Sequence, residues 1–321
     1  MKAVRVRSFG SVEQLELIEK EDPHVGEEEV MVRLNACGLS FADVLQRQGL
    51  YHGGPQPPFF PGLEASGTIE KTGLSVTSVS TGLRVSIIAS HGLHADRAVV
   101  NAQNCIPLPE AIADDEGAAF PVQYLTAYHS LVTVAKAIAG ETVLIHAAAG
   151  GLGTAAIQVA KLLGLVVIGT ASTEKKRQYA LEVGADLATS YDSFDVDVLR
   201  VTNKKGPEII LESIGGEIFR RSIAILPPLG RLIVLGFTGM QPRPVDTLKL
   251  LFSSHAVMGF HLNSLLRNQD LLHDSIRKII TWISDGKLKV RIGHVFPLAE
   301  IGKAHKLLES RESCGKIILL P

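Results

Sequence analysis

The chain has 321 residues, a length that predicts about two domains. Lys and Arg together number 32 and Asp and Glu 33, so the formal net charge of −1 gives no electrostatic support for nucleic-acid binding. Hydrophobic residues make up 46% and charged residues 20%, which excludes a disordered chain, and three cysteines are too few for a disulfide framework or a four-cysteine zinc site.

The first 121 residues predict a small β-rich domain. Residues 1–7 alternate charged with apolar side chains, and residues 30–36 alternate with the period of a strand that has one buried face. Further strands are predicted near residues 65–70, 83–89, 96–101 and 104–108. Glycines and prolines between residues 53 and 58 indicate an irregular loop, because proline fixes φ and removes a donor.

Strands and helices alternate from residue 141 onward. Strands are predicted at 141–146, 165–169, 187–190, 208–211 and 231–235, with helices between them at 153–163, 174–183 and 194–203. This alternation predicts an α/β fold with a doubly wound parallel sheet, a Rossmann domain that we place at residues 122–260. A C-terminal segment follows at 261–321, with one helix at 271–284 and short strands at 294–297 and 315–320.

No targeting or membrane-spanning segment is expected. The first residues read as a strand rather than as a signal peptide. The most apolar stretch, residues 143–170, is interrupted by His146, Gln158 and Lys161, whereas a spanning helix needs about 20 predominantly apolar residues. We therefore predict a cytoplasmic protein without a membrane span.

A glycine-rich loop lies between the predicted strand at 141–146 and the helix at 153–163. Residues 146–153 read HAAAGGLG. The free N–H groups and the dipole at the start of a helix favour an anion. Gly150 and Gly151 would let a pyrophosphate approach the backbone, and Gly153 would let the helix pack against the strand. In this context we favour dinucleotide binding over a purely structural turn.

The end of the second strand of this array indicates which dinucleotide. Sites for NAD usually carry Asp or Glu there, but this strand ends in Gly-Thr-Ala-Ser at residues 169–172. Lys175, Lys176 and Arg177 follow, and a hydroxyl with a cation suits a 2′-phosphate. We therefore favour NADPH. The alternatives are a solvated basic helix face and a contact between Glu174 and the ribose.

Three short segments are similar to a known family. They are residues 36–43, which read ACGLSFAD, residues 47–51, which read RQGLY, and residues 259–262, which read GFHL. Over its whole length the chain resembles the zinc-independent, zeta-crystallin-like quinone oxidoreductases of the medium-chain dehydrogenase/reductase superfamily. Within them it resembles the subgroup that includes the synaptic-vesicle amine transport protein homologues. The resemblance implies a GroES-like catalytic domain that the C-terminal segment completes, a Rossmann domain that binds NADPH, and a homodimer.

The resemblance also implies roles for single residues in cofactor binding. The family's pyrophosphate loop matches Gly150, Gly151, Leu152 and Gly153, and its 2′-phosphate site matches Ser172, Lys176 and Tyr191. Thr126 matches a threonine near the nicotinamide end. Phe237, Phe260 and Leu262 fall on segments that line the cofactor. Lys316 matches a further cofactor-binding position of the family. Many relatives have Asn at the position of Ser40, so we expect the contact made there to be altered or bridged by water.

The zinc site of the zinc-dependent relatives is incomplete in this sequence. Those relatives take ligands from a C-G motif, a G-H-E motif and a later cysteine. Here Cys37 and Gly38 are kept, but Leu63 stands where the histidine would be. Because a catalytic zinc needs three protein ligands, we predict no metal. Cys37 is then interpreted as a buried small residue rather than a reactive thiol, and His91 and His94 as surface-loop residues.

Without a metal, the hydride acceptor must itself be electrophilic, as a quinone or an α,β-unsaturated carbonyl is. Tyr51, at a position resembling the tyrosine of related enoyl reductases, is the leading proton donor, with packing on the cofactor as the alternative. Asp43 would orient a donor or cap a helix, and Ser40 is the third catalytic candidate. Flat walls for a ring-shaped acceptor, or simply core, are expected from Phe41, Phe59 and Tyr124.

The sequence thus predicts an NADPH-dependent oxidoreductase that reduces a small quinone or enone. One alternative is an enoyl-thioester reductase, which would need room and cations for the arm of its substrate, and the candidate cations are Arg47, Arg243 and Lys249. Another is a regulatory or membrane-associated protein that binds NADPH with little turnover. No nucleic-acid partner is expected at this net charge.

Overall fold

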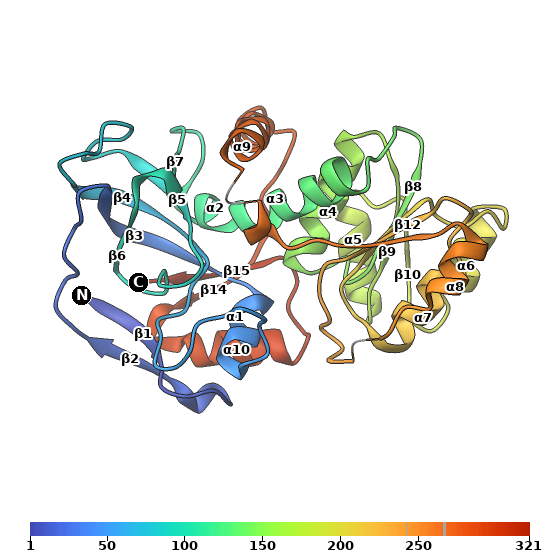
Figure 1. Cartoon of the computed structure of the whole chain (residues 1–321), viewed down its shortest axis with the longest axis horizontal. Helices are drawn as coiled ribbons and strands as arrows, with labels where there is room; N and C mark the ends of the chain where they lie inside the picture. The colour runs from blue at the N-terminus through green and yellow to red at the C-terminus, as the bar shows by residue number, and fades with distance from the viewer. Residues whose placement is uncertain (242, 266–267) are drawn as a thin grey trace. The chain divides into compact units, whose positions relative to one another are not determined.

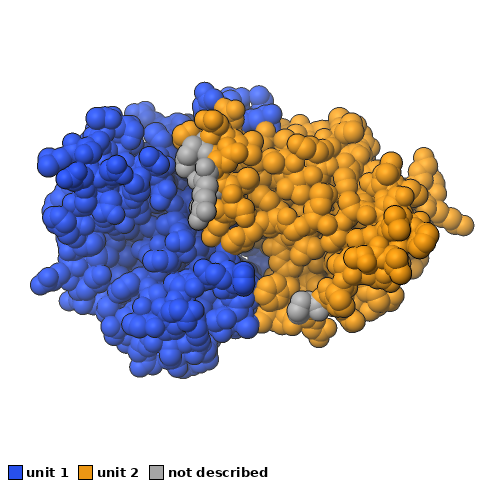
Figure 2. All heavy atoms as spheres, viewed as in Figure 1, with its two compact units in different colours: residues 1–122, 276–321 blue, residues 123–275 orange. Residues whose placement is uncertain are grey.

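The computed structural model describes residues 1–241, 243–265 and 268–321. They form two compact units, Met1–Val122 with Ile276–Pro321 (unit 1) and Gln123–Ser275 (unit 2) (Figures 1 and 2). The sequence-based boundaries were placed after residues 121 and 260, whereas the units divide after Val122 and after Ser275. Helix α9 (Gln269–Ser284) therefore crosses the second division.

Unit 1 is built on a seven-stranded sheet of order β14-β15-β3-β4-β5-β7, with β6 also paired to β3. The strands are β3 (Glu29–Leu39), β4 (Glu64–Thr72), β5 (Arg84–Ile88), β6 (Arg97–Asn101), β7 (Cys105–Pro107), β14 (Ile292–Pro297) and β15 (Lys316–Leu320). A separate antiparallel pair joins β1 (Lys2–Val6) to β2 (Leu15–Glu19). Strand β15 pairs with β3, Ile318 opposite Gly38, so the C-terminal segment completes the sheet of the first domain.

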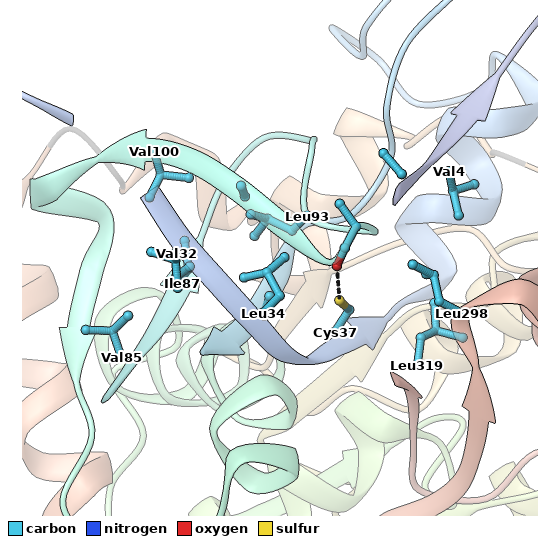
Figure 3. Packing of buried hydrophobic residues seen from close by; sticks show 14 of the residues in the cluster. Val4, Val32, Leu34, Cys37, Val85, Ile87, Leu93, Val100, Leu298 and Leu319 are labelled. Carbon is cyan, nitrogen blue, oxygen red and sulfur yellow. Dashed lines mark hydrogen bonds between the residues drawn. The ribbon is translucent and has the colours of Figure 1, made fainter. Parts of the chain in front are cut away.

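Three short helices accompany this sheet: α1 (Phe41–Gln48), α2 (Asp114–Ala119) and α10 (Ile301–Glu309). The core of unit 1 joins the alternate side chains of its strands, among them Val32, Leu34, Val85 and Leu319 (Figure 3). Cys37 belongs to this core and is fully buried, which confirms its interpretation as a small buried residue.

Unit 2 is built on a six-stranded parallel sheet of order β10-β9-β8-β11-β12-β13. The strands are β8 (Thr142–Ile145), β9 (Val166–Thr170), β10 (Leu187–Thr189), β11 (Ile209–Glu212), β12 (Arg231–Val234) and β13 (Ala256–Gly259). Numbered along the chain, this is the order 3-2-1-4-5-6 of dinucleotide-binding sheets. The predicted Rossmann fold is therefore confirmed.

The helices of unit 2 are α3 (Pro121–Tyr128, which begins in unit 1), α4 (Gly151–Leu162), α5 (Glu174–Val183), α6 (Phe194–Val201), α7 (Gly216–Ala224) and α8 (Thr247–Ser253). Apolar side chains of α6 and α7 pack on Leu144, Ile168 and Ile210 of the sheet. Among the described residues, none of the helices combines the length and apolar character that crossing a membrane requires.

Local signals set the ends of several helices. At the start of α5, the Thr173 hydroxyl oxygen accepts a hydrogen bond from the Lys176 N–H. The helix ends at Gly184, where φ is 124°. Helix α1 ends at Gly49 in the left-handed region, φ 74°, which glycine adopts without strain.

Candidate functional site

The cofactor candidates of unit 2 follow the carboxyl ends of its strands. Each lies within five residues of the end of a strand: Gly150 follows β8, Ser172 follows β9, Tyr191 follows β10, Phe237 follows β12 and Phe260 follows β13. Parallel strands share one carboxyl edge, so these residues lie along a single edge of the sheet. The chain reverses its strand order at β8, and open α/β sheets bind ligands in the crevice at that point.

The glycine loop ends where α4 begins. Its N-cap residue, Gly150, has no side chain with which to cap the first N–H groups, which therefore remain available to an anion. A Cβ on Gly153 would lie 2.3 Å from the Ala147 carbonyl oxygen, so only glycine fits the close approach of helix and loop. Gly151 and Leu152 form the half-buried first turn beside it.

Tyr191 supports the glycine loop. Its hydroxyl oxygen accepts a hydrogen bond of 2.9 Å from the Ala147 N–H. Its ring stacks on His146 with 6.1 Å between the ring centroids. This phenol therefore holds the first turn of the loop that the sequence assigns to pyrophosphate.

Arg221 on α7 fixes the segment that carries Tyr191. Its guanidinium donates to the carbonyl oxygens of Tyr191, at 2.7 Å, and Asp192, at 2.9 Å. It is paired with Asp195 and lies 4.6 Å over the ring of Phe194. Sequence reasoning missed Arg221, because a basic residue on an amphipathic helix is indistinguishable from one on a solvated face.

His146 is buried beneath the same loop. Its Nδ1 is 2.8 Å from the Thr170 hydroxyl oxygen and its Nε2 is 2.7 Å from that of Ser222. Burial, with a smaller effect of Arg221, lowers the pKa of His146 to about 3. The imidazole is therefore neutral and ties β8, β9 and α7 together.

The neutral state of His146 makes the stability of the fold depend on pH. The unfolded chain takes up a proton on this histidine near pH 6.5, whereas the folded chain does so only near pH 3. Stability is therefore complete above the unfolded pKa and is lost as pH falls. Between about pH 7 and about pH 5 we expect the free energy of unfolding to fall by ~2 kcal/mol from this group.

Denaturant unfolding at the two pH values measures this effect. A His146→Gln variant keeps a donor and an acceptor but does not titrate, so its stability should change less with pH. The same substitution at the exposed His24 should leave the wild-type dependence in place. Equal pH dependence in wild type and His146→Gln would contradict the assignment.

The 2′-phosphate candidates lie at the end of β9 and the start of α5. Ser172 is exposed and Lys176 is half-buried in the first turn of the helix. The carboxylate of Glu174 accepts a hydrogen bond of 2.7 Å from Arg177. Arg177 also donates to the Ala171 carbonyl oxygen, at 3.3 Å. The side chain of Glu174 is 82% exposed, so this surface pair leaves the alternative in which Glu174 holds a ribose open.

Glu212, at the end of β11, is a residue that sequence reasoning missed. Its carboxylate is buried and accepts hydrogen bonds from the Ile214 N–H, at 2.8 Å, and the Gly215 N–H, at 2.9 Å. Burial raises the pKa of Glu212 and the two N–H donors lower it, burial being the larger effect. The sequence signal that could have indicated this role is an acidic residue at the end of a strand, followed closely by two glycines. The turn it shapes accepts a 2.8 Å bond from the Thr238 N–H, next to Phe237.

Thr126 lies in α3, ahead of a π-helical segment at His129–Val134, a geometry frequent at functional sites. Its carbonyl oxygen accepts a 2.6 Å bond from the Ser130 hydroxyl.

The ring of His129 lies 6.4 Å from that of Phe260, and its Nε2 is 2.9 Å from the Ser275 hydroxyl. Leu262 is buried after Phe260. Tyr124 is also buried, its hydroxyl oxygen accepting a 3.0 Å bond from Gln158.

In unit 1, the catalytic candidate Ser40 joins a buried ion pair. The ammonium of Lys316 is paired with the carboxylate of Glu64 and donates to the Ser40 hydroxyl at 2.8 Å. The second oxygen of Glu64 accepts a 2.8 Å bond from the Val122 N–H. Lys316 is only 3% exposed, so the structure gives this cofactor candidate an internal carboxylate partner.

Asp43 caps α1. Its Oδ2 accepts a 2.8 Å hydrogen bond from the Ser40 N–H, which confirms the capping interpretation. Tyr51 lies in the turn after the same helix and is half-buried. Burial and the nearby charge of Asp43 raise the pKa of Tyr51 to about 12, so the phenol keeps its proton and can donate it in a hydrogen bond. Phe41 is half-buried, while Phe59 is buried and its backbone pairs with Val6.

The interpretation of His94 as a surface residue is wrong. His91 is exposed, but His94 is fully buried, with its Nε2 3.2 Å from the Gly38 carbonyl oxygen. The reason is backbone pairing between distant segments: the His94 N–H donates to Pro61, and its carbonyl oxygen accepts from Val4.

At the position that matches a zinc ligand of the zinc-dependent relatives, the Cys37 thiol donates to the Ala95 carbonyl oxygen at 3.7 Å (Figure 3). Burial raises the pKa of this thiol to about 12. Leu63 is buried. In the part of the chain that the structure describes, no three His, Cys, Asp or Glu side chains gather closely enough to hold a metal ion.

Comparison with known proteins places these features in a family. Residues 26–110 match the alcohol dehydrogenase GroES-like domain and residues 151–284 the zinc-binding dehydrogenase family. The synaptic vesicle membrane protein VAT-1 homolog of Danio rerio is 34% identical over 99% of this chain and 69% of its own length.

Solved structures of quinone oxidoreductases are also similar to this chain. The quinone oxidoreductase of Escherichia coli, complexed with NADPH, superposes with a TM-score of 0.95 at 29% identity, over 100% of both chains. That of Thermus thermophilus, also solved with NADPH, gives 0.89 at 36% identity over 100% of both chains. The chain belongs to the medium-chain dehydrogenase/reductase superfamily, in its quinone oxidoreductase-like subgroup.

Proposed function

We propose that this oxidoreductase transfers a hydride from NADPH to a quinone or an α,β-unsaturated carbonyl compound, without zinc. The observation that carries the proposal is the set of residues along the carboxyl edge of the parallel sheet, with a glycine loop after β8 and no acid at the tip of β9. Two similar quinone oxidoreductases are solved with NADPH, which supports the same cofactor here.

The residues of unit 2 fit NADPH. The close approach at Gly153 and the uncapped start of α4 suit a pyrophosphate. In the proposed site, Ser172, Lys176 and Tyr191 hold the 2′-phosphate. The segments with Thr126, Phe237 and Phe260 line the remainder. Bound NADPH would supply the hydride, and the chain's own residues would position the acceptor, exclude water and supply the proton.

The proton donor that we propose is Tyr51. Reduction of a quinone or an enone creates negative charge on the acceptor oxygen, and a phenol with a raised pKa is a neutral donor for that oxygen. Ser40 and Asp43 take positioning roles in this proposal, because their polar groups are bonded to Lys316 and to the start of α1.

The proposal includes no zinc. Of the three protein ligands that a catalytic zinc needs, the sequence keeps only the Cys37 thiol, and this thiol is bonded to a backbone carbonyl oxygen. Leu63 offers no ligand atom. An electrophilic acceptor therefore suits this chain better than an alcohol, whose oxidation needs activation.

Arg47 bears on the enoyl-thioester alternative. Its side chain is fully buried, donates to the Gly10 carbonyl oxygen at 2.8 Å and is paired with Glu309. Arg47 is therefore bonded to partners within unit 1 and is not a candidate to bind the arm of an enoyl-thioester substrate.

A homodimer is part of the proposal. Strand β13 stands at the end of the parallel sheet, where a second copy could pair with it. The nearby helix α8 presents the exposed apolar side chains Leu248, Leu251 and Phe252. Such a group supports an interface rather than a solvated face.

Replacing Lys176 by alanine is expected to weaken NADPH binding by about 10- to 100-fold, because a charge-assisted hydrogen bond contributes about 1.5–3 kcal/mol. NADH, which lacks the 2′-phosphate, should lose less than about twofold. Fluorescence titration of both cofactors measures the ratio. Lys175→Ala, at an exposed neighbour, is the matched control. Equal losses of affinity for NADPH and NADH would contradict the assignment of Lys176 to the 2′-phosphate.

The proposed activity is tested by the rate of NADPH oxidation with a panel of acceptors: an o-quinone, a p-quinone, a simple enone and an enoyl thioester. We expect turnover with a quinone or the enone that is faster with NADPH than with NADH. Tight NADPH binding without reduction of any acceptor would overturn the proposal in favour of a regulatory role.

A further inference from the structure

A group of buried polar side chains lies between α1, α10 and the loop that precedes β6 in unit 1. Helix α1 packs on α10, and Arg47 of α1 is paired with Glu309 of α10. Gln46 of α1 donates to the Ser90 carbonyl oxygen of the loop at 3.0 Å. We refer to Asp43, Gln46, Arg47, His94 and His305 as the α1 polar cluster.

The side chains of this cluster are at most 2% exposed, yet several of their polar atoms lack a partner. Over the described residues, nine buried side-chain nitrogen and oxygen atoms have no hydrogen-bond partner, and six of them belong to the cluster. The six are Asp43 Oδ1, Gln46 Oε1, Arg47 Nε, His94 Nδ1, and Nδ1 and Nε2 of His305. Gln46 and Arg47 lie three and four residues after Asp43 on one face of α1, and α1 packs on α10, which carries His305. His94 and Arg47 both act on the pKa of His305, which is consistent with this placement.

Six unpartnered atoms would be too costly for the fold. Each buried donor or acceptor without a partner costs about 1–3 kcal/mol, so six would cost roughly 6–18 kcal/mol. A whole domain is stable by only about 5–15 kcal/mol. We therefore expect these atoms to have partners besides the chain itself.

The kinds of atom identify those partners. Nε2 of His94 faces a carbonyl oxygen and so carries the hydrogen, which leaves its Nδ1 as an acceptor. Asp43 Oδ1 and Gln46 Oε1 are also acceptors, Arg47 Nε is a donor, and a neutral His305 offers one of each. Water both donates and accepts, and bridges such mixed sets in protein interiors. A cation is disfavoured by the guanidinium of Arg47.

We propose that the α1 polar cluster binds ordered internal water, and that this water carries protons from the Glu309 side of the cluster to Tyr51, with Asp43 orienting the water. The water site stands on its own, whereas the proton path rests on the function proposed above. Glu309 is 30% exposed and lies four residues after His305 on α10, hence on the same helix face.

The charges around this path are compatible with it. Burial, with His94 and Arg47, lowers the pKa of His305 well below its usual value, so the ring stays neutral and can accept a proton at one nitrogen while donating from the other. Arg47, which has donors and no acceptor, only orients water. Asp43 is coupled to both His94 and Tyr51. Further charges near the described part of this region are Glu64, Lys316, Glu309 and Glu13.

Protons balance over one turnover. The acceptor gains a hydride from the cofactor, and its oxygen gains the phenolic proton of Tyr51. The Tyr51 phenolate then takes a proton from a water molecule of the cluster, which regains one through His305 from solvent near Glu309. One solvent proton is consumed. The transfer leaves His305 as its other tautomer, and the ring regains its first tautomer before the next turnover by moving a proton back between its two nitrogens through the bound water.

Two substitutions at His305 separate water binding from proton transfer. His305→Gln keeps a donor and an acceptor that hold water, but an amide does not pass a proton from one atom to the other. His305→Leu removes both. His91→Leu, at an exposed histidine of the loop before His94, is the control.

We expect a crystal structure of the wild-type protein at high resolution to contain waters within hydrogen-bond distance of His305 and Asp43. At saturating acceptor, His305→Gln and His305→Leu should lower kcat by at least about tenfold with an unchanged affinity for NADPH, whereas His91→Leu should not. His305→Gln should also show a larger solvent deuterium isotope effect than wild type.

The ways in which the proposal could fail are distinguishable. A cluster without water in the crystal structure would overturn the water site. Bound water together with an unchanged kcat in both His305 variants would overturn the proton path. If the wild-type protein reduces no acceptor, the proposed function and the proton path fail together, while the crystal structure still decides the water site.

Discussion

Replacing Glu64 by glutamine is expected to lower the free energy of unfolding by about 3–5 kcal/mol. Lys316 is only 3% exposed and its ammonium is paired with this carboxylate, so the substitution leaves a buried charge without a counter-charge. Denaturant or thermal unfolding of the purified protein measures the loss.

Two further variants show whether the effect comes from the buried charge. Glu300→Gln breaks the exposed pair of Glu300 with Lys303 and should cost less than about 1 kcal/mol. Adding Lys316→Met to Glu64→Gln removes the unpaired charge and should restore much of the stability. A Glu64→Gln protein as stable as Glu300→Gln would show that the pair contributes little.

Replacing Tyr51 by phenylalanine is expected to lower kcat by about 10²- to 10⁴-fold, the usual contribution of a positioned acid. The affinity for NADPH should not change, because only the phenolic oxygen is removed. Stopped-flow or steady-state reduction of the best acceptor gives kcat, and fluorescence titration gives the affinity.

Tyr179→Phe, at a half-buried tyrosine of α5, is the matched control and should leave kcat unchanged. If Tyr51→Phe turns over at the wild-type rate, Tyr51 packs on the cofactor or the acceptor and another group supplies the proton. A parallel loss of NADPH affinity would likewise assign the residue to packing.

Much of unit 2 could be predicted because its signals are local. The alternation of apolar strands with helices indicated the parallel sheet, and the three glycines after β8 indicated the helix start that suits a pyrophosphate. The helix predicted at 174–183 has the same limits in the structure, since Thr173 caps it and Gly184 ends it.

The polar interior of unit 1 could not be predicted in the same way. Glu64 and Lys316 form their pair across 252 positions of sequence, and periodicity carries no information on such a pairing. His94 is buried because its backbone pairs with Pro61 and Val4, so its own neighbours in sequence gave the wrong expectation. Arg221 and Glu212 were missed because their roles are to bond backbone groups of turns.

The measurement that most directly tests the central claim follows the fate of the transferred hydrogen. The wild-type protein would be incubated with an enone and NADPH that carries deuterium at the transferable position of the nicotinamide, and the product analysed by mass spectrometry and NMR. Hydride transfer predicts one deuterium at the β-carbon of the product, and a solvent-derived proton at the neighbouring carbon or oxygen. A reduced product without deuterium at that carbon would contradict the account.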